Sequence, residues 1–138
     1  MEKTLVLIKP DGVQRGLIGS IISFYEEKSL YIVALKMLQA DRIIAEKHYE
    51  EHQQKEYFKD LIDYITEGRI CAMIIGGEDV IDIVRKIHGD KNPKLAEMGS
   101  IRGIYAADRT RNLVHASDNK ENAKREMALW FPEMGWFL

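Results

Sequence analysis

The sequence has little of several residue types, and each shortage removes a class of protein. Among 138 residues there is one cysteine, Cys71, so no disulfide can form within the chain. There are only three prolines, and we find no linker, internal repeat or low-complexity tract. No apolar run is long enough to span a bilayer. Met1-Glu2-Lys3 leads into a strand-like segment and not into a signal peptide. We therefore expect a cytoplasmic protein without a membrane partner, in which Cys71 is a core residue.

Charge of one sign is also scarce. The formal net charge is −2 and the isoelectric point is about 6.1, so the bulk electrostatics indicate no nucleic-acid partner. Hydrophobic residues make up 46% of the chain, which is enough for one core at this length but not for two. We expect residues 1–138 to form a single domain.

Apolar periodicity predicts four strands separated by helices. The strands are expected at residues 4–8, 31–38, 70–75 and 112–115. Helical stripes are expected at residues 18–25, 41–52, 58–65, 80–87 and around 123–130. Pro10-Asp11-Gly12 predicts a turn, and residues 89–110 lack periodicity and predict a long loop. This order predicts an α+β, ferredoxin-like βαββαβ fold with a four-stranded antiparallel sheet, a helical pair inserted between strands 2 and 3, and a long loop before strand 4.

The segment Asn112-Leu113-Val114-His115-Ala116-Ser117-Asp118 is the most informative part of the chain. It predicts a short strand that carries His115 and ends at a helix start, where Ser117 and Asp118 offer side-chain oxygens as caps and Glu121 fits a capping box with Asp118. The backbone N–H groups at a helix N-terminus favour an anion, so the site suits phosphate chemistry. Taken alone, the segment fits a surface histidine in a capped turn at least as well.

Three basic residues elsewhere could join His115 in binding a polyphosphate. Lys9 ends the first strand, Arg85 lies off the apolar face of its helix, and Arg102 lies in the long loop. Each alone fits a solvated side chain. A polyphosphate needs several converging cations, because several charged oxygens must be neutralised together.

Joined in order, these segments resemble the nucleoside diphosphate kinase family. The resemblance is carried by Lys9-Pro10-Asp11-Gly12-Val13-Gln14-Arg15-Gly16, His48-Tyr49, Asn92-Pro93, Ile101-Arg102-Gly103 and the segment around His115, and it runs from about Lys3 to Pro132. It implies transfer of the γ-phosphoryl group from a nucleoside triphosphate to a nucleoside diphosphate by a ping-pong reaction that maintains nucleoside triphosphate pools. The implied substrates are ATP, ADP, GTP, GDP and the deoxy forms.

The resemblance also implies roles for individual residues. His115 matches the phosphorylated histidine, Glu126 a carboxylate that orients it, and Tyr49 a tyrosine beside it. Positions that contact phosphate, ribose or base are matched by Lys9, Tyr57, Leu61, Arg85, Lys91, Arg102, Asn112 and Ser117. Tyr57 and Leu61 would hold the base, and stacking tolerates every base because each has a π-face. Lys91 departs from the family, which commonly has a threonine there.

Mg²⁺ is expected to arrive with the nucleotide phosphates, since Mg²⁺ commonly binds through them and no carboxylate cluster resembles a dedicated metal site. The resemblance further implies a homo-oligomer, either a tetramer or a hexamer.

Two alternatives from other classes remain open at this level. His48-Tyr49-Glu50-Glu51-His52 matches the H-x-x-E-H pattern of inverted zinc peptidases. A ferredoxin-like sheet can also serve as an RNA-binding platform, although the usual RNP signature and a basic balance are both lacking.

Overall fold

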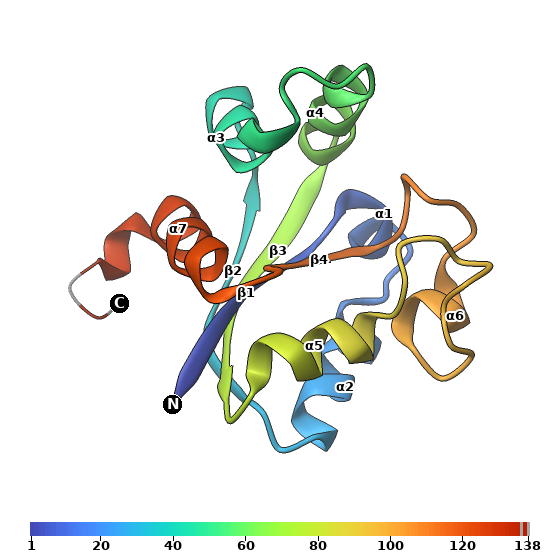
Figure 1. The fold of residues 1–138 in the computed structure, drawn as a ribbon, viewed down its shortest axis with the longest axis vertical. Coiled ribbons are helices and arrows are strands. Elements are labelled where there is room, and N and C mark those ends of the chain that lie inside the picture. Colours follow the sequence, from blue (N-terminus) through green and yellow to red (C-terminus); the bar gives the residue numbers. More distant parts are fainter. Residues whose placement is uncertain (136, 138) are drawn as a thin grey trace.

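A computed structural model describes residues 1–135 and 137 (Figure 1). The elements follow the order β1 (Glu2–Ile8), α1 (Pro10–Gln14), α2 (Ile18–Glu27), β2 (Tyr31–Gln39), α3 (Arg42–His48), the 3₁₀ turn η1 (Glu50–His52), α4 (Phe58–Thr66), β3 (Arg69–Gly77), α5 (Val80–His88), α6 (Ile101–Tyr105), β4 (Val114–Ala116), α7 (Lys120–Trp130) and the 3₁₀ turn η2 (Pro132–Met134).

The four strands form one antiparallel sheet in the order β2-β3-β1-β4. The pair α3 and α4 is inserted between β2 and β3, and the α5–β4 connection is long. The fold is α+β and ferredoxin-like, as the sequence predicted. In the β1–β4 register Leu7 is paired with His115, which places His115 in the middle of the shortest strand beside a central one.

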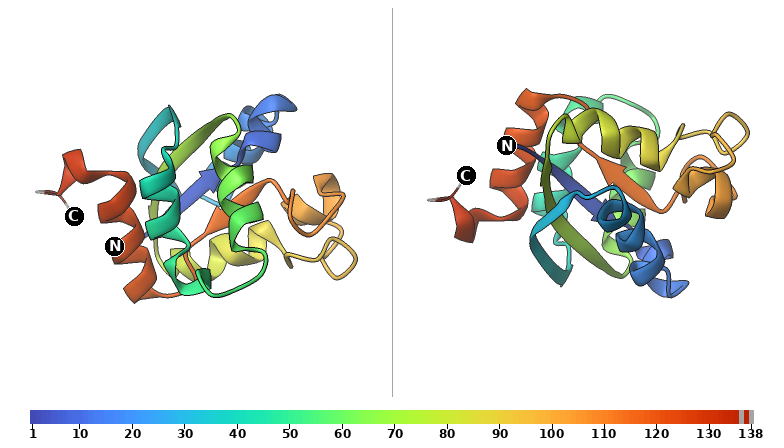
Figure 2. Two further views of the ribbon diagram at one scale, coloured as in Figure 1. Left: turned by 90° about the horizontal axis from the view of Figure 1, so that it is seen from above. Right: turned by 90° about the horizontal axis from the view of Figure 1, so that it is seen from below.

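The core is built around the two central strands. Residues 5–8 of β1 and 70–75 of β3 are fully buried, including Cys71. Helices α2 and α5 lie on one side of the sheet, and α3 and α7 lie on the other (Figures 1 and 2). Because both faces are covered, the central strands offer no open platform of the kind that RNA-binding sheets use. Within the described residues, no helix has the length and apolarity needed to cross a membrane.

Two local predictions missed a short helix, and a third named the wrong helix cap. The expected turn at Pro10 is the short helix α1, which has proline at its first position, where a missing N–H costs nothing. The expected long loop contains α6, whose cap Ser100 accepts the Gly103 N–H at 3.0 Å. The cap of α7 is Asn119 and not Asp118, since the Asn119 side chain accepts the N–H of Asn122.

The segment expected as one helix over residues 41–52 is divided. Asp41 caps α3 by accepting the Ile44 N–H at 2.8 Å, as predicted, but α3 ends at His48. Tyr49 is its C-cap, and the separate turn η1 carries His52.

Candidate active site

A cavity of about 970 Å³ opens where the α3–α4 pair, the end of α5 and strand β4 meet. It is lined by ten of the eleven predicted site residues, namely Lys9, Tyr49, Tyr57, Leu61, Arg85, Lys91, Arg102, Asn112, His115 and Glu126. The eleventh, Ser117, is fully buried and does not line the cavity. Its hydroxyl donates to Glu126 instead, and its expected contact with a nucleotide stays a prediction.

His115 is held by a short hydrogen-bonded chain. Its Nε2 lies 2.8 Å from Glu126 Oε1, and the same oxygen accepts the Ser117 hydroxyl at 2.7 Å. Burial and the nearby Lys9 and Lys91 ammonium groups hold the pKa of His115 well below its ordinary value. The imidazole is thus neutral at physiological pH, and the Glu126 contact assigns its proton to Nε2.

Lys9 and Asn112 both line the cavity and are joined by a hydrogen bond. The Lys9 backbone N–H donates to Leu113 O at 2.8 Å, and its Nζ donates to Asn112 Oδ1 at 3.0 Å. Leu113 has a φ of +77°, a conformation that β-carbon sterics disfavour and that the surrounding contacts maintain. Burial and the Arg102 charge lower the pKa of Lys9 to about 7.

Arg102 is fixed by three backbone carbonyls. It donates from Nε to Asn112 O at 3.2 Å, from Nη1 to Gly89 O at 2.8 Å and from Nη2 to Val114 O at 2.6 Å. Gly89 has a φ of +83°, and a β-carbon there would lie 2.3 Å from Ser100 Oγ, so this close approach requires glycine. Burial lowers the pKa of Arg102 to about 10, which leaves it charged at neutral pH.

Two further cations and an aromatic complete the cavity wall. Arg85 and Lys91 are exposed and line the cavity together with Arg102. Burial and the Arg102 and Arg85 charges lower the pKa of Lys91. Tyr57 is 48% exposed one helical turn before Leu61, so its ring face is available at the mouth of the cavity.

The H-x-x-E-H pattern does not form a zinc-binding pair in the described residues. Helix α3 ends at His48, whose Nδ1 accepts the Trp130 Nε1–H at 3.0 Å. His52 lies in η1 and pairs instead with the Tyr57 hydroxyl at 3.2 Å. The one candidate group of metal ligands within the described residues is His48, His115 and Glu126, whose ligand atoms lie within 4.8 Å of one another. Its members are already engaged in the hydrogen bonds described above.

Comparison with known proteins supplies the class of enzyme. The family model described as nucleoside diphosphate kinase matches residues 2–135. The chain belongs to the nucleoside diphosphate kinase family. It is a phosphotransferase that acts between nucleoside tri- and diphosphates.

Individual relatives agree over nearly the whole chain. The nucleoside diphosphate kinase of Saccharolobus islandicus strain L.S.2.15 is 50% identical over 131 residues, covering 95% of each chain. Nucleoside diphosphate kinase 1 of Saccharum officinarum is 51% identical over 133 residues, covering 96% of this chain and 89% of the relative.

Solved structures give the same result for the fold. An apo nucleoside diphosphate kinase from Encephalitozoon cuniculi has a TM-score of 0.93 at 39% identity, covering 94% of this chain and 88% of its own. The Halobacterium salinarum enzyme, solved in complex with CDP, has a TM-score of 0.91 at 42% identity, covering 94% of this chain and 87% of its own.

Sequence reasoning missed several residues of the cavity. His88 lies there with its Nε2 2.6 Å from the hydroxyl of the fully buried Tyr25. Its position after Ile81 and Val84 on the buried row of α5 was a signal that could have identified it as a buried polar residue. Arg125 and the imidazole of His48 depend on contacts with distant segments, which no local pattern contains.

Proposed function

We propose that this chain transfers the γ-phosphoryl group through a phosphohistidine at His115. The observation that carries the proposal is the Glu126 contact, because it occupies Nε2 and leaves the lone pair of Nδ1 as the nucleophile. In the first half-reaction Nδ1 forms a bond to the γ-phosphorus while the bond to the β–γ bridging oxygen breaks. The electron pair of that bond leaves with the nucleoside diphosphate. In the second half-reaction an acceptor diphosphate takes the group by the reverse steps.

Charge neutralisation supports this proposal. Lys9, Arg85, Lys91 and Arg102 share the cavity with His115, and no described carboxylate forms a salt bridge within 4.0 Å with any of these four cations. A transferring phosphoryl group carries charge on its equatorial oxygens, so positioned cations are the main source of catalysis. The buried hydroxyl of Tyr49 lacks a hydrogen-bond partner in the described residues and could donate to the same oxygens.

Mg²⁺ fits the cavity as part of the nucleotide. Oxygen ligands suit this ion, and the carboxylate of Asp118 lines the cavity with Arg85 and His115 among its charged neighbours. Asp118 is the residue that would hold it. When bound, Mg²⁺ supplies positive charge to the phosphate oxygens.

Broad base specificity is the second part of the proposal. The exposed Tyr57 ring and the half-buried Leu61 side chain offer a stacking surface at the mouth of the cavity. A stacked base is recognised through its π-face, so adenine, guanine and pyrimidines should all be accepted, in ribose and deoxyribose forms.

Labelling and kinetics together test the mechanism. Incubation with ATP labelled at the γ-phosphate should give a protein-bound label that is acid-labile and base-stable, and His115→Asn should abolish it. Initial rates over varied donor and acceptor should give parallel double-reciprocal lines. Intersecting lines, or label retained in His115→Asn, would refute the phosphohistidine.

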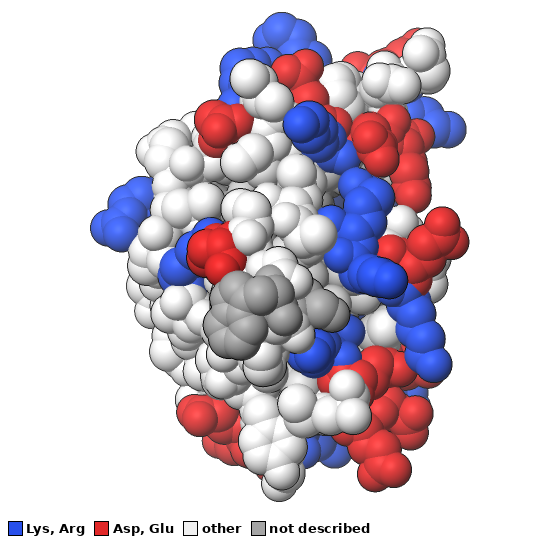
Figure 3. All heavy atoms as spheres, turned by 90° about the vertical axis from the view of Figure 1, so that its left-hand side faces the viewer, with Lys and Arg blue, Asp and Glu red and all other residues white. Residues whose placement is uncertain are grey.

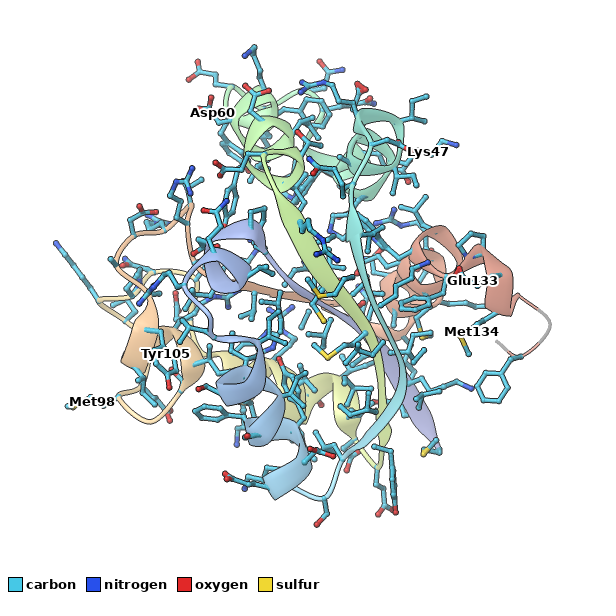
Figure 4. All side chains as sticks on the ribbon, turned by 180° about the vertical axis from the view of Figure 1, so that it is seen from behind. Lys47, Asp60, Met98, Tyr105, Glu133 and Met134 are labelled. Carbon is cyan, nitrogen blue, oxygen red and sulfur yellow. The ribbon has the colours of Figure 1, made fainter. Side chains whose placement is uncertain are left out.

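We further propose that the protein is a homo-oligomer, either a tetramer or a hexamer. The β2 edge of the sheet exposes Tyr31 (63%) and Leu35 (48%), and the α5–β4 connection exposes Met98 (89%), which points away from the body of the molecule (Figure 4). Figure 3 shows a broad area free of charged side chains beside regions where acidic and basic groups are intermixed. Exposed apolar side chains such as Tyr31, Leu35 and Met98 are typical of subunit contacts. A monomer in sedimentation at micromolar concentration would contradict this.

We also propose that residues 1–138 form one domain that works in the cytoplasm. A single core cluster and a lone buried cysteine support these two points.

A further inference from the structure

We propose that His48 is a further catalytic residue, whose Nε2–H donates a hydrogen bond to the phosphoryl group as it moves to and from His115. Trp130 is the positioning residue that fixes His48 for this task. The inference rests on the proposed phosphohistidine mechanism and deepens it.

The tautomer of His48 follows from its contact with Trp130. An indole N–H can only donate, and Trp130 Nε1 lies 3.0 Å from His48 Nδ1. Nδ1 must therefore offer a lone pair. His48 is 4% exposed, and burial together with His115 holds its pKa well below the ordinary value, so the ring carries a single proton. That proton lies on Nε2.

The ring stands directly against the proposed nucleophile. The centroids of His48 and His115 are 4.4 Å apart, and their planes cross at 77°. One nitrogen of His48 lies within 4.8 Å of a nitrogen of His115 and of a Glu126 oxygen. A hydrogen-bond donor on the His48 ring therefore lies beside any group attached to His115.

The Nε2–H has no acceptor among residues 1–135 and 137, although the residue lines the cavity. Nε2 is not one of the buried polar atoms that lack a partner, so it is accessible from the cavity, where an entering phosphoryl oxygen would accept its hydrogen bond. Because His48 is neutral, it adds a donor without adding to the repulsion among Lys9, Lys91 and Arg102. His48 keeps its proton throughout, and no bond to it forms or breaks.

The same tautomer argues against a metal ion at His48, His115 and Glu126. Metal binding at Nε2 would require the proton to move to Nδ1, where it would oppose the Trp130 N–H. Addition of Zn²⁺ alone should therefore leave the melting temperature of the protein unchanged in the absence of nucleotide.

The main test is the rate of His115 phosphorylation in a single turnover, compared with the dissociation constant for ADP. His48→Phe keeps the volume and removes the donor, and we expect the rate to fall about ten- to a hundredfold with ADP affinity within about twofold. His48→Gln, which retains an N–H, should recover part of the loss. Ile62→Val, a core change outside the cavity, controls for reduced stability.

His48→Phe leaves the Trp130 N–H without an acceptor, which could prevent folding. The double variant His48→Phe/Trp130→Phe removes both polar groups, so it supplies a folded protein in which the rate can be measured. A single-turnover rate within about twofold of wild type in either folded variant would overturn the proposal. So would a loss of ADP affinity as large as the loss of rate.

Nitrogen NMR of histidine-labelled protein tests the tautomer directly. We expect His48 to carry its proton on Nε2 in the wild type and to populate both tautomers in Trp130→Phe. A proton on Nδ1 in the wild type would overturn the assignment. Failure of the wild type itself to form a base-stable phosphoenzyme would refute the phosphohistidine mechanism instead, and the NMR result would still stand apart from it.

Discussion

The ammonium of Lys9 and the amide oxygen of Asn112 lie 3.0 Å apart, although 103 positions separate them in the sequence. Lys9 is also crowded by Arg102, and together with burial this lowers its pKa from 10.5 to about 7. The charged form is therefore destabilised by folding. Below pH 7 both folded and unfolded chains hold the proton and the penalty is complete, whereas it fades as the pH rises from 7 to 10.5.

We expect Lys9→Met to be more stable than the wild type at pH 6, by on the order of 1–4 kcal/mol, even though Asn112 loses its partner. The difference should shrink at pH 9.5. Thermal melts at the two pH values measure it, and ATP should raise the melting temperature of the wild type much more than that of the variant. A Lys9→Met protein that melts below the wild type at pH 6 would contradict this account.

Glu126→Gln should lower kcat by about ten- to a hundredfold while KM changes little. The glutamine keeps the shape of the contact with His115 but loses the charge that stabilises the ring as phosphorylation makes it more positive. Ser117→Ala removes only one of the two hydrogen bonds to Oε1, so its loss should be about two- to tenfold. Steady-state kinetics of both variants test whether Glu126→Gln loses more kcat than Ser117→Ala. A larger loss of kcat in Ser117→Ala would contradict this account.

Arg102→Ala should reduce the free energy of unfolding by about 2–4 kcal/mol, because two buried carbonyl groups and one part-buried carbonyl group lose their donor. The free energy of unfolding of Arg102→Lys should lie between those of the wild type and Arg102→Ala, since one ammonium cannot replace the guanidinium at three diverging acceptors. The exposed Arg85→Ala removes the same charge and serves as the control, with an expected change within about 0.5 kcal/mol. Urea denaturation measures all three, and equal effects of Arg102→Ala and Arg85→Ala would refute the structural part of this role.

The buried pair Tyr25 and His88 should show strong coupling in a double-mutant cycle. Tyr25→Phe leaves a buried imidazole without its 2.6 Å partner, and His88→Leu leaves a buried hydroxyl without an acceptor, so each should cost about 1–3 kcal/mol. Removing both polar groups together should cost much less than the sum. Additive losses in chemical denaturation would show that the hydrogen bond contributes nothing.

Lys91→Ala should raise KM for the nucleotide, more at low than at high ionic strength, because an exposed cation makes a screened contact with the phosphates. Lys91→Thr should keep most of kcat, since a contact made equally in substrate and transition state affects KM alone. The matched control is Lys94→Ala, which removes a neighbouring exposed charge outside the cavity. An unchanged KM for Lys91→Ala at both salt concentrations would show that Lys91 is only a solvated loop residue.

The sequence was sufficient to predict a helix or strand where the apolar pattern extends over many residues. The strands β1, β2 and β3 and the helices α2, α4, α5 and α7 follow patterns of apolar residues that span whole elements. It was insufficient for α1 and α6, each of five residues, because one and a half turns contain no period. The capping choice between Asp118 and Asn119 also escaped it, since neighbouring side chains of similar chemistry compete and the backbone decides between them.

The candidate site was also predictable only in part. The sequence motifs predicted most of its residues, but they did not predict the contacts between them. The partner of His48 is 82 positions away, and the partner of Ser117 is Glu126, nine positions away in α7. Whether a residue touches the cavity or supports one that does depends on a few ångströms of tertiary geometry.

Because Lys9, Lys91 and Arg102 lie close together, dissolved anions should bind to the free protein. Arg102 and Lys91 lower the pKa of Lys9, and Arg102 lowers the pKa of Lys91, so any anion that enters the cavity relieves their repulsion. Sulfate or inorganic phosphate should therefore raise the melting temperature of the free protein while competing with nucleotide. Kinetics recorded in phosphate buffer would then describe a partly occupied enzyme, and an amine buffer, whose charged form is a cation that the cavity repels, gives the proper reference state.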